Sequence, residues 1–258
     1  MNFISKLLQY VKYRVIPPHN MRTDKAENFY FSEYAKVIFP LIETKKSILD
    51  VGCQFGRFTI PAYEAGAEIT ATDIHPRFFK YINKKIPGNS IQFRLEDIDQ
   101  TCKSLPENSF DIVLCLELLY NLPDSQKKIT DLTKLVKPGG LFITSHRSLG
   151  YYLFRFIKER KFDEAEKIIQ ANHPYYNAQT ASELKHIYHN NNLILNSLTP
   201  IGMFSGFGND PFSSIINPKR ANNMAKQQLN QFESNEKLFD LFGESARYWL
   251  VVASKITK

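Results

Sequence analysis

The stretch Ser47-Ile48-Leu49-Asp50-Val51-Gly52-Cys53-Gln54-Phe55-Gly56 decides the fold of this chain. Its first five residues form a short apolar run typical of a buried strand, and its two glycines predict a tight turn before a helix. An acid, Asp73, follows about 20 residues later, after a second strand-like run. This arrangement is typical of an α/β protein that holds a nucleoside, because the turn admits the ligand close to the backbone and the acid accepts the ribose hydroxyls.

Strand-like and helix-like segments alternate regularly downstream of this stretch. Such alternation predicts a Rossmann-like, doubly wound α/β fold with a mostly parallel sheet. Two later strand-like runs would bring the sheet to seven strands. The expected strands are 47–51, 67–72, 90–95, 110–115, 140–145, 193–198 and 248–254, and the expected helices of the core are 56–64, 76–85 and 124–135.

The flanking segments predict helices and insertions around one domain that spans residues 1–258. Residues 3–15 have apolar positions at helical spacing and end at Pro17-Pro18, and a second helix is expected to run to about Leu41. The stretches 149–172 and 181–191 also favour helices, whereas 201–244 is rich in glycine and proline and ends in a helical run. The predicted parts are N-terminal helices 1–45, a cofactor-binding core 46–147, a helical cap 148–180 and a C-terminal part 181–258 that contains an insertion at 201–244.

Composition narrows the class of protein. The chain has 258 residues, a formal charge of +7 and three cysteines, which are too few for a disulfide framework, so a reducing, cytoplasmic compartment is expected. No apolar run approaches the ~20 residues that span a bilayer. The basic excess is compatible with anionic partners, but a solvated, mildly basic surface is the simpler explanation. The absence of zinc spacing and of an RNA-binding aromatic motif argues against nucleic acid.

Further motifs follow the glycine turn in a fixed order. Ile69 to Ile74 and Phe93 to Ile98 are strands that end in acids, Phe110 to Glu117 is a third such strand, and Leu135 to Ile143 contains Lys-Pro-Gly-Gly before another strand. The ordered set resembles the class I S-adenosylmethionine-dependent methyltransferases, closely over residues 45–147 and loosely over 175–255. A nicotinamide enzyme would require a fuller glycine fingerprint.

The resemblance implies S-adenosylmethionine as the cofactor and gives each motif residue a role. Asp73 would accept the ribose hydroxyls, while Asp97 and the Ile98 amide would bind adenine and the Ile74 side chain would pack on it. Asp50 would support the turn and the ammonium group of the ligand, and Gln54 stands where the family often has a third glycine. The implied cofactor-binding set is Asp50, Gly52, Gln54, Gly56, Asp73, Ile74, Asp97, Ile98 and Leu116. Alternatively, Asp73 and Asp97 are ordinary acids of strand-end turns.

Two segments are similar to the ubiquinone-biosynthesis O-methyltransferases within this class, namely 144–148 and 173–177. Those enzymes carry an acid and then a Glu-His pair after the fourth strand, which can hold a divalent metal. Here Glu117 keeps the first acid, but Tyr120 and Asn121 stand at the other two positions. One carboxylate and one amide make a poor site for a hard cation, so no metal is predicted.

The sequence offers three candidates for a catalytic base. Methyl transfer from a sulfonium mainly requires that the acceptor be positioned, and a base helps where the acceptor is a hydroxyl. His146 is the first candidate because it lies at the carboxyl end of a central strand, near the expected cofactor crevice. Glu117 and Tyr120 are the alternatives, and a structural or solvent-exposed role for His146 stays open.

The acceptor is expected to be a small or lipid-like molecule, methylated on oxygen or nitrogen. Aromatic residues of the variable segments suit an apolar or aromatic acceptor, although core packing explains many of them. Residues 2–15 form a basic amphipathic stretch that would allow peripheral contact with a membrane, or would simply cap the site. The alternatives are a protein or RNA methyltransferase and a non-catalytic S-adenosylmethionine-binding subunit.

Overall fold

The computed structural model describes residues 25–257 apart from 87, 89, 123, 207–210, 218 and 219. One seven-stranded sheet runs through them in the order β3-β2-β1-β4-β5-β7-β6. The neighbouring strands from β3 to β5 pair in parallel, and β7 is antiparallel to both β5 and β6. The predicted seven-stranded, mostly parallel sheet is therefore confirmed. The strands are β1 Ser47–Val51, β2 Glu68–Asp73, β3 Gln92–Leu95, β4 Phe110–Cys115, β5 Val136–Arg147, β6 Leu193–Ile201 and β7 Tyr248–Lys255.

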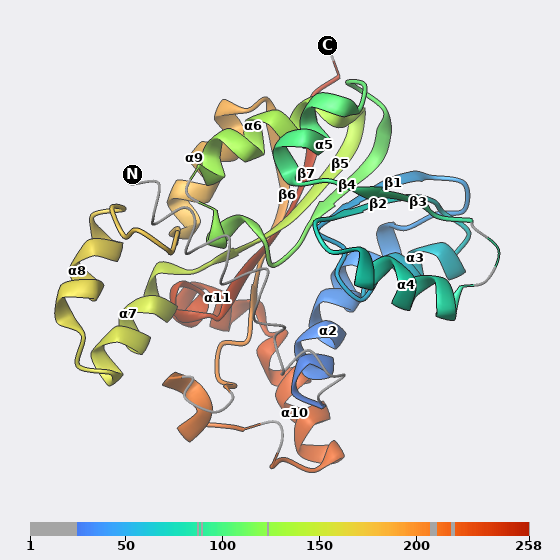
Figure 1. The fold of residues 1–258 in the computed structure, drawn as a ribbon. Helices are drawn as coiled ribbons and strands as arrows, with labels where there is room; N and C mark the ends of the chain where they lie inside the picture. Colours follow the sequence, from blue (N-terminus) through green and yellow to red (C-terminus); the bar gives the residue numbers. More distant parts are fainter. Residues whose placement is uncertain are drawn as a thin grey trace.

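Helices cover both faces of the sheet, as Figure 1 shows. One face packs against α2, α3 and α4, and the other packs against α5, α6 and α9. In chain order, α7 and α8 follow β5, and they form a helical pair at one end of the molecule (Figure 1). The segment of chain that connects β6 to β7 contains α10 and α11. The described α-helices are α2 Lys25–Ile38, α3 Thr59–Glu64, α4 Pro76–Lys85, α5 Ile98–Ser104, α6 Ser125–Leu135, α7 Leu149–Lys158, α8 Phe162–Ile169, α9 Ala181–Asn190, α10 Asn223–Glu233 and α11 Glu236–Phe242.

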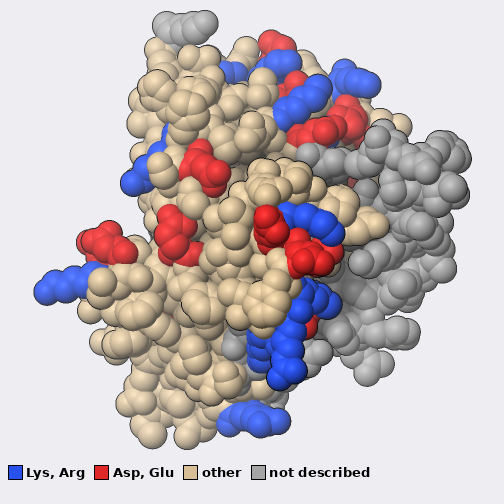
Figure 2. All heavy atoms as spheres, turned by 90° about the vertical axis from the view of Figure 1, so that its left-hand side faces the viewer, with Lys and Arg blue, Asp and Glu red and all other residues tan. Residues whose placement is uncertain are grey.

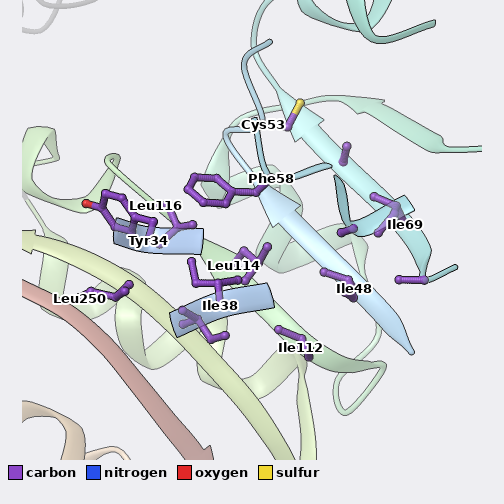
Figure 3. Close-up of a cluster of buried hydrophobic side chains, with 14 of the residues drawn as sticks. Tyr34, Ile38, Ile48, Cys53, Phe58, Ile69, Ile112, Leu114, Leu116 and Leu250 are labelled. Atoms are coloured by element: carbon purple, nitrogen blue, oxygen red, sulfur yellow. The ribbon is translucent and has the colours of Figure 1, made fainter. Parts of the chain in front are cut away.

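Helix α2 closes one face of the sheet with an apolar stripe. Tyr30, Tyr34 and Ile38 are four residues apart and are 4%, 0% and 0% exposed, as one buried face of a helix requires. Figure 3 shows Tyr34 and Ile38 lying over Leu114 of β4 and Leu250 of β7. The same cluster continues to Phe58 and Ile48, so α2 is packed against the sheet that carries the glycine turn.

Three helical segments differ from the sequence prediction. The helix expected at 56–64 begins only at Thr59, because Gln54 and Gly56 take left-handed backbone conformations with φ of 47° and 75°. The stretch 149–172 contains two helices, because Arg160 has a φ of 56° between α7 and α8. Helix α5 was not predicted, although Asp97 and Gln100 form a capping box at its start. The helix expected at 3–15 lies outside the described residues.

Two buried acids, Glu33 of α2 and Glu233 of α10, anchor the loop that follows β6. Glu33 Oε2 accepts a hydrogen bond from the Gly202 amide (3.2 Å), and Glu233 Oε1 accepts one from the Phe204 amide (2.6 Å). Burial and repulsion from Glu233 raise the pKa of Glu33, and burial raises the pKa of Glu233. Protonation of this acid pair therefore favours the contact between α2, α10 and the loop that follows β6.

The surface around the cap carries both signs of charge. Figure 2 faces the side of the molecule that carries α7 and α8, where basic and acidic side chains are interspersed among larger uncharged areas. Within the described part of the chain, no helix is both long and apolar enough to cross a membrane.

Candidate cofactor and acceptor site

A cavity of about 300 Å³ lies beside the glycine turn, at the carboxyl ends of β1 and β4. Its wall combines the turn with the first residues after β4 and with aromatic side chains from α2 and α4. Ligand crevices of open α/β sheets form at this edge of the sheet. Six of the predicted site residues line it, namely Asp50, Gly52, Gln54, Gly56, Leu116 and Glu117.

The backbone around the cavity is held in an uncommon conformation. Gly52 and Gly56 both have a φ of 75°, and Gln54 and Glu117 are non-glycine residues with φ of 47° and 54°. A Cβ on Gly56 would lie 2.7 Å from Cγ1 of Ile82, so this turn requires glycine there. Left-handed non-glycine residues cost free energy and concentrate at functional sites. Two such residues, Gln54 and Glu117, lie on the wall of one cavity, which supports its assignment as the functional site.

Asp50 supports the turn from beneath. It is 4% exposed, and its Oδ2 accepts a hydrogen bond from the Thr59 hydroxyl at 2.5 Å. Burial raises its pKa to about 6, although the bond from Thr59 acts in the opposite direction. An incoming cationic group would stabilise the charged carboxylate, which fits the expected role of Asp50 towards an ammonium group.

Asp73 is tied to the glycine turn by its side chain. Its Oδ2 accepts a hydrogen bond from the Gln54 amide (3.1 Å), and its Oδ1 accepts one from the His75 amide (3.0 Å). Burial raises the pKa of Asp73, and these two amides oppose that rise. Each carboxylate oxygen has a second lone pair, so both can still accept a ribose hydroxyl.

The residues expected to hold adenine lie at the edge of the sheet beyond the cavity. Ile74 is 36% exposed and Leu95, which pairs in register with Asp73, is 59% exposed, so two apolar side chains face solvent beside Asp73. The Ile98 side chain is buried. Asp97 caps α5, and its Oδ1 accepts a hydrogen bond from the Gln100 amide at 2.8 Å. Asp97 thus caps α5 as an acid of a strand-end turn can, and its second carboxylate oxygen accepts no such bond from the described residues.

Glu117 connects the cavity with the end of β5. Its backbone amide donates to the Ser145 hydroxyl at 2.6 Å, and its carboxylate lies 3.4 Å from Nη1 of Arg57. Both side chains of this ion pair are about one quarter exposed, at 24% and 28%. A carboxylate with solvent access on the cavity wall is able to accept a proton from a bound acceptor.

Tyr120 is placed in an aromatic cluster beside this wall. Its ring packs against Tyr248 with centroids 5.9 Å apart, and the guanidinium of Arg147 lies over it at 4.9 Å. Burial and Tyr248 raise its pKa well above the ordinary value, so the hydroxyl stays protonated at neutral pH. A protonated phenol at this place can donate a hydrogen bond but does not act as a base.

His146 lies on the opposite face of the sheet, which corrects the prediction that it reaches the cofactor crevice. It is 1% exposed, and its Nε2 lies 2.9 Å from the Thr144 hydroxyl and 3.0 Å from the Tyr188 hydroxyl of α9. Burial lowers its pKa to about 4. The alternation of side chains along β5 explains this placement, because Ser145 and Arg147 take the face that carries the cavity. Strand parity was therefore the signal that could have found Arg147.

The described residues include no group of three or more His, Cys, Asp or Glu side chains that could hold a metal ion. Near the cavity, Glu117 pairs with Arg57, and the amide of Asn121 donates to the Glu117 carbonyl oxygen at 3.5 Å.

The comparisons with known proteins agree with this geometry. Residues 49–144 match a family model described as a methyltransferase domain. The ubiquinone biosynthesis O-methyltransferase of Nitrosospira multiformis is 31% identical over 116 residues, which are 43% of this chain and 48% of the relative. The enzyme of the same name from Vibrio atlanticus is 32% identical over 120 residues, 45% of this chain and 50% of the relative. The chain thus spans about half the length of the curated relatives it matches.

Solved structures share the fold over nearly the whole chain. An S-adenosylmethionine-dependent methyltransferase of Mesorhizobium loti superposes with a TM-score of 0.58 at 17% identity, covering 88% of this chain and 98% of that one. The 1,6-didemethyltoxoflavin-N1-methyltransferase of Burkholderia thailandensis, solved with S-adenosylhomocysteine, gives 0.59 at 15% identity and covers 98% and 87%. Residues 49–144 thus match a methyltransferase domain, and the fold of the chain is that of S-adenosylmethionine-dependent methyltransferases of known structure. The cofactor that the motifs predicted, S-adenosylmethionine, agrees with the methyltransferase domain matched by residues 49–144.

Proposed function

We propose that the protein transfers a methyl group from S-adenosylmethionine to an oxygen or nitrogen of a small-molecule acceptor. The observation that carries the proposal is the cavity whose wall joins the glycine turn to Glu117, because it brings the cofactor motif together with a partly exposed carboxylate. The curated relatives that match the chain are O-methyltransferases by name, which supports a small hydroxylated acceptor.

The residues of this chain would act mainly by positioning. Bound S-adenosylmethionine supplies the activated methyl group. Asp73 would hold the ribose and Ile74 would contact the adenine, while Asp50 supports the turn against which the methionine part lies. Gly52, Gln54, Gly56 and the backbone at Leu116 shape that part of the cavity.

Glu117 is the residue proposed to take the proton from a hydroxyl acceptor. It faces the cavity, whereas Tyr120 stays protonated and His146 lies on the other side of the sheet. Tyr120 would stabilise the acceptor through its ring and through its neighbour Arg147. An amine acceptor would need the same positioning and little help from a base.

The test is methyl transfer itself. Purified protein is incubated with methyl-labelled S-adenosylmethionine and a panel of phenols, carboxylic acids, amines and lipid extracts, and S-adenosylhomocysteine release is measured with and without each acceptor. Acceptor-dependent release with label in a small molecule supports the proposal. Label found only in added protein or RNA would support the macromolecular alternative, and binding without any transfer would favour the non-catalytic subunit.

A further inference from the structure

Arg147 ends β5 inside a cage of three tyrosine rings. Its Cζ lies 4.1 Å from the ring centroid of Tyr248, 4.6 Å from that of Tyr151 and 4.9 Å from that of Tyr120. Cation–π contacts of this kind stabilise a partly desolvated cation, and they fix the plane of a guanidinium more firmly than they fix an ammonium group. The cage therefore holds the Arg147 group at one place and in one orientation, at the carboxyl edge of the sheet.

Most of the hydrogen-bonding capacity of this guanidinium is unused. The group has five N–H donors, and among the described residues Nη1 alone donates, to the Arg247 carbonyl oxygen across 3.4 Å. Its Nε is buried without an acceptor, and no carboxylate of the described residues pairs with it. Burial by itself would lower the pKa of Arg147, but Tyr248 and Tyr120 raise it, so the group stays charged. A cation held in this way is costly until an anion supplies the missing acceptors.

A second cation reinforces the positive potential. The Cζ of Arg247 lies 5.5 Å from the ring centroid of Tyr151 and 5.6 Å from that of Tyr248, so both guanidiniums contact the same two rings. Repulsion from Arg247 acts to lower the pKa of Arg147. An anion that bound between the rings would relieve this repulsion.

The cage adjoins the cavity that contains the cofactor motif. Ser145 precedes Arg147 by two residues, about 7 Å along the strand and on the same face, and its hydroxyl accepts the amide hydrogen of Glu117. Glu117 itself lines the cavity, and Tyr120 follows it in a short 3-10 helix. A small molecule could therefore reach Arg147 with one end while its other end lies beside Glu117.

We propose that Arg147 binds an anionic oxygen group of the methyl acceptor, either a carboxylate or a phosphate. The acceptor is thus a small acid whose charged end is recognised inside the tyrosine cage. This inference rests on the proposed function, because it describes the molecule that the methyltransferase would modify. A planar fork of N–H donors suits two oxygens of one acid group, and Lys does not offer the same geometry.

The experiment titrates three probes of one shape into the protein and follows binding by calorimetry and ligand-observed NMR. Benzoate carries a carboxylate, phenyl phosphate carries a phosphate, and benzamide is the neutral match of benzoate. At least one of the two anions is expected to bind about tenfold more tightly than benzamide, and Arg147→Met should abolish that preference. Arg155→Met is the matched control, because Arg155 lies on α7 and pairs with Glu159. The anion that binds more tightly shows whether the site recognises a carboxylate or a phosphate.

Several results would overturn the inference. These are an equal affinity for benzamide, a preference that survives in Arg147→Met, and the absence of anion binding below about 20 mM. Arg147→Lys keeps the charge and should weaken anion binding severalfold, and it decides the matter if the methionine variant does not fold. S-adenosylhomocysteine affinity and the thermal midpoint are measured for each variant first. Failure of the wild-type protein to bind S-adenosylhomocysteine would contradict the proposed function. The preference for an anion over benzamide is measured without S-adenosylhomocysteine, so its failure would contradict only the role proposed for Arg147.

Discussion

The Gln54 backbone amide donates a hydrogen bond to Oδ2 of Asp73 across 3.1 Å. This bond joins the glycine turn after β1 to the acid at the end of β2, and it spans 19 residues of sequence. It also explains how a turn that lacks a third glycine is held, because Gln54 has a φ of 47° and its amide is fixed by the carboxylate. The proposed ribose acid is therefore part of the structure of the turn as well as part of the binding site.

Asp73→Ala is expected to weaken S-adenosylhomocysteine binding about a hundredfold, because it removes charge-assisted bonds to the ligand and the anchor of the turn. Calorimetry on the purified variant checks this. Asp163→Ala, an exposed acid on α8, is the control and should bind as the wild type does. Unchanged binding in Asp73→Ala would remove the assigned ribose contact.

Asp97 has a structural role and a proposed ligand role that two substitutions separate. Asp97→Ala should lower the free energy of unfolding by about 1 kcal/mol because α5 loses its cap. Asp97→Asn keeps a good capping residue but loses the negative charge, so it should retain stability and still weaken S-adenosylhomocysteine binding about tenfold. Urea unfolding and calorimetry measure the two effects. Full affinity in the asparagine variant would leave Asp97 with the cap alone.

Glu117→Gln is expected to lower kcat for a hydroxyl acceptor by roughly a hundredfold or more, since the amide cannot take the proton. Cofactor binding should stay within about twofold of the wild type because the backbone conformation is kept. The steady-state rate is measured together with S-adenosylhomocysteine affinity. Glu68→Gln, at the amino end of β2, is the matched control. Equal kcat in both variants would exclude Glu117 as the base.

His146 is expected to make folding sensitive to acid. It is neutral in the fold with a pKa of about 4, whereas the unfolded chain binds a proton near 6.5, so its stability contribution is present above 6.5 and is lost as the pH falls towards 4. Between pH 7.5 and pH 5 the loss is about 2 kcal/mol. Urea unfolding is measured at both pH values in the wild type and in His146→Gln. The loss of stability between the two pH values should be smaller in the variant, and the difference is the contribution of His146.

The control variant is His189→Gln. His189 is an exposed histidine of α9, so this variant should keep the wild-type pH dependence of the free energy of unfolding. Because His146 lies on the face of β5 away from the cavity, folded His146→Gln is also expected to retain methyl transfer. If instead that variant is folded and inactive, His146 reaches the reaction in a way that its present contacts do not provide.

Local signals account for what could be predicted from the sequence. The apolar run before Gly52 and the acid Asp73 lie within about 25 residues of each other in the chain. The strand, the turn and the candidate binding acid could therefore be predicted together. The parallel sheet follows from regular alternation, and the resemblance of ordered motifs supplied the cofactor. The alternation of faces along β5 was also available, and it would have separated His146 from the cavity.

The tyrosine cage could not be predicted in the same way. Its rings come from Tyr120, Tyr151 and Tyr248, which lie on three different elements, and the antiparallel insertion of β7 beside β5 brings the last of them to Arg147. Such a contact depends on sheet order, which periodicity does not report. Aromatic residues in the variable segments were predicted to build an acceptor site, but their arrangement around a cation was not.

The most direct test of the account is calorimetric titration of the purified protein with S-adenosylhomocysteine, with NADH as the comparison. The geometry of the glycine turn, Asp50 and Asp73 predicts one site per chain with a micromolar dissociation constant, about a thousandfold weakening or complete loss of binding in the Gly56→Val, Asp73→Ala double variant, and no binding of NADH. Absence of S-adenosylhomocysteine binding by folded wild-type protein, or equal binding of NADH, would contradict the assignment of this cavity to the methyl donor.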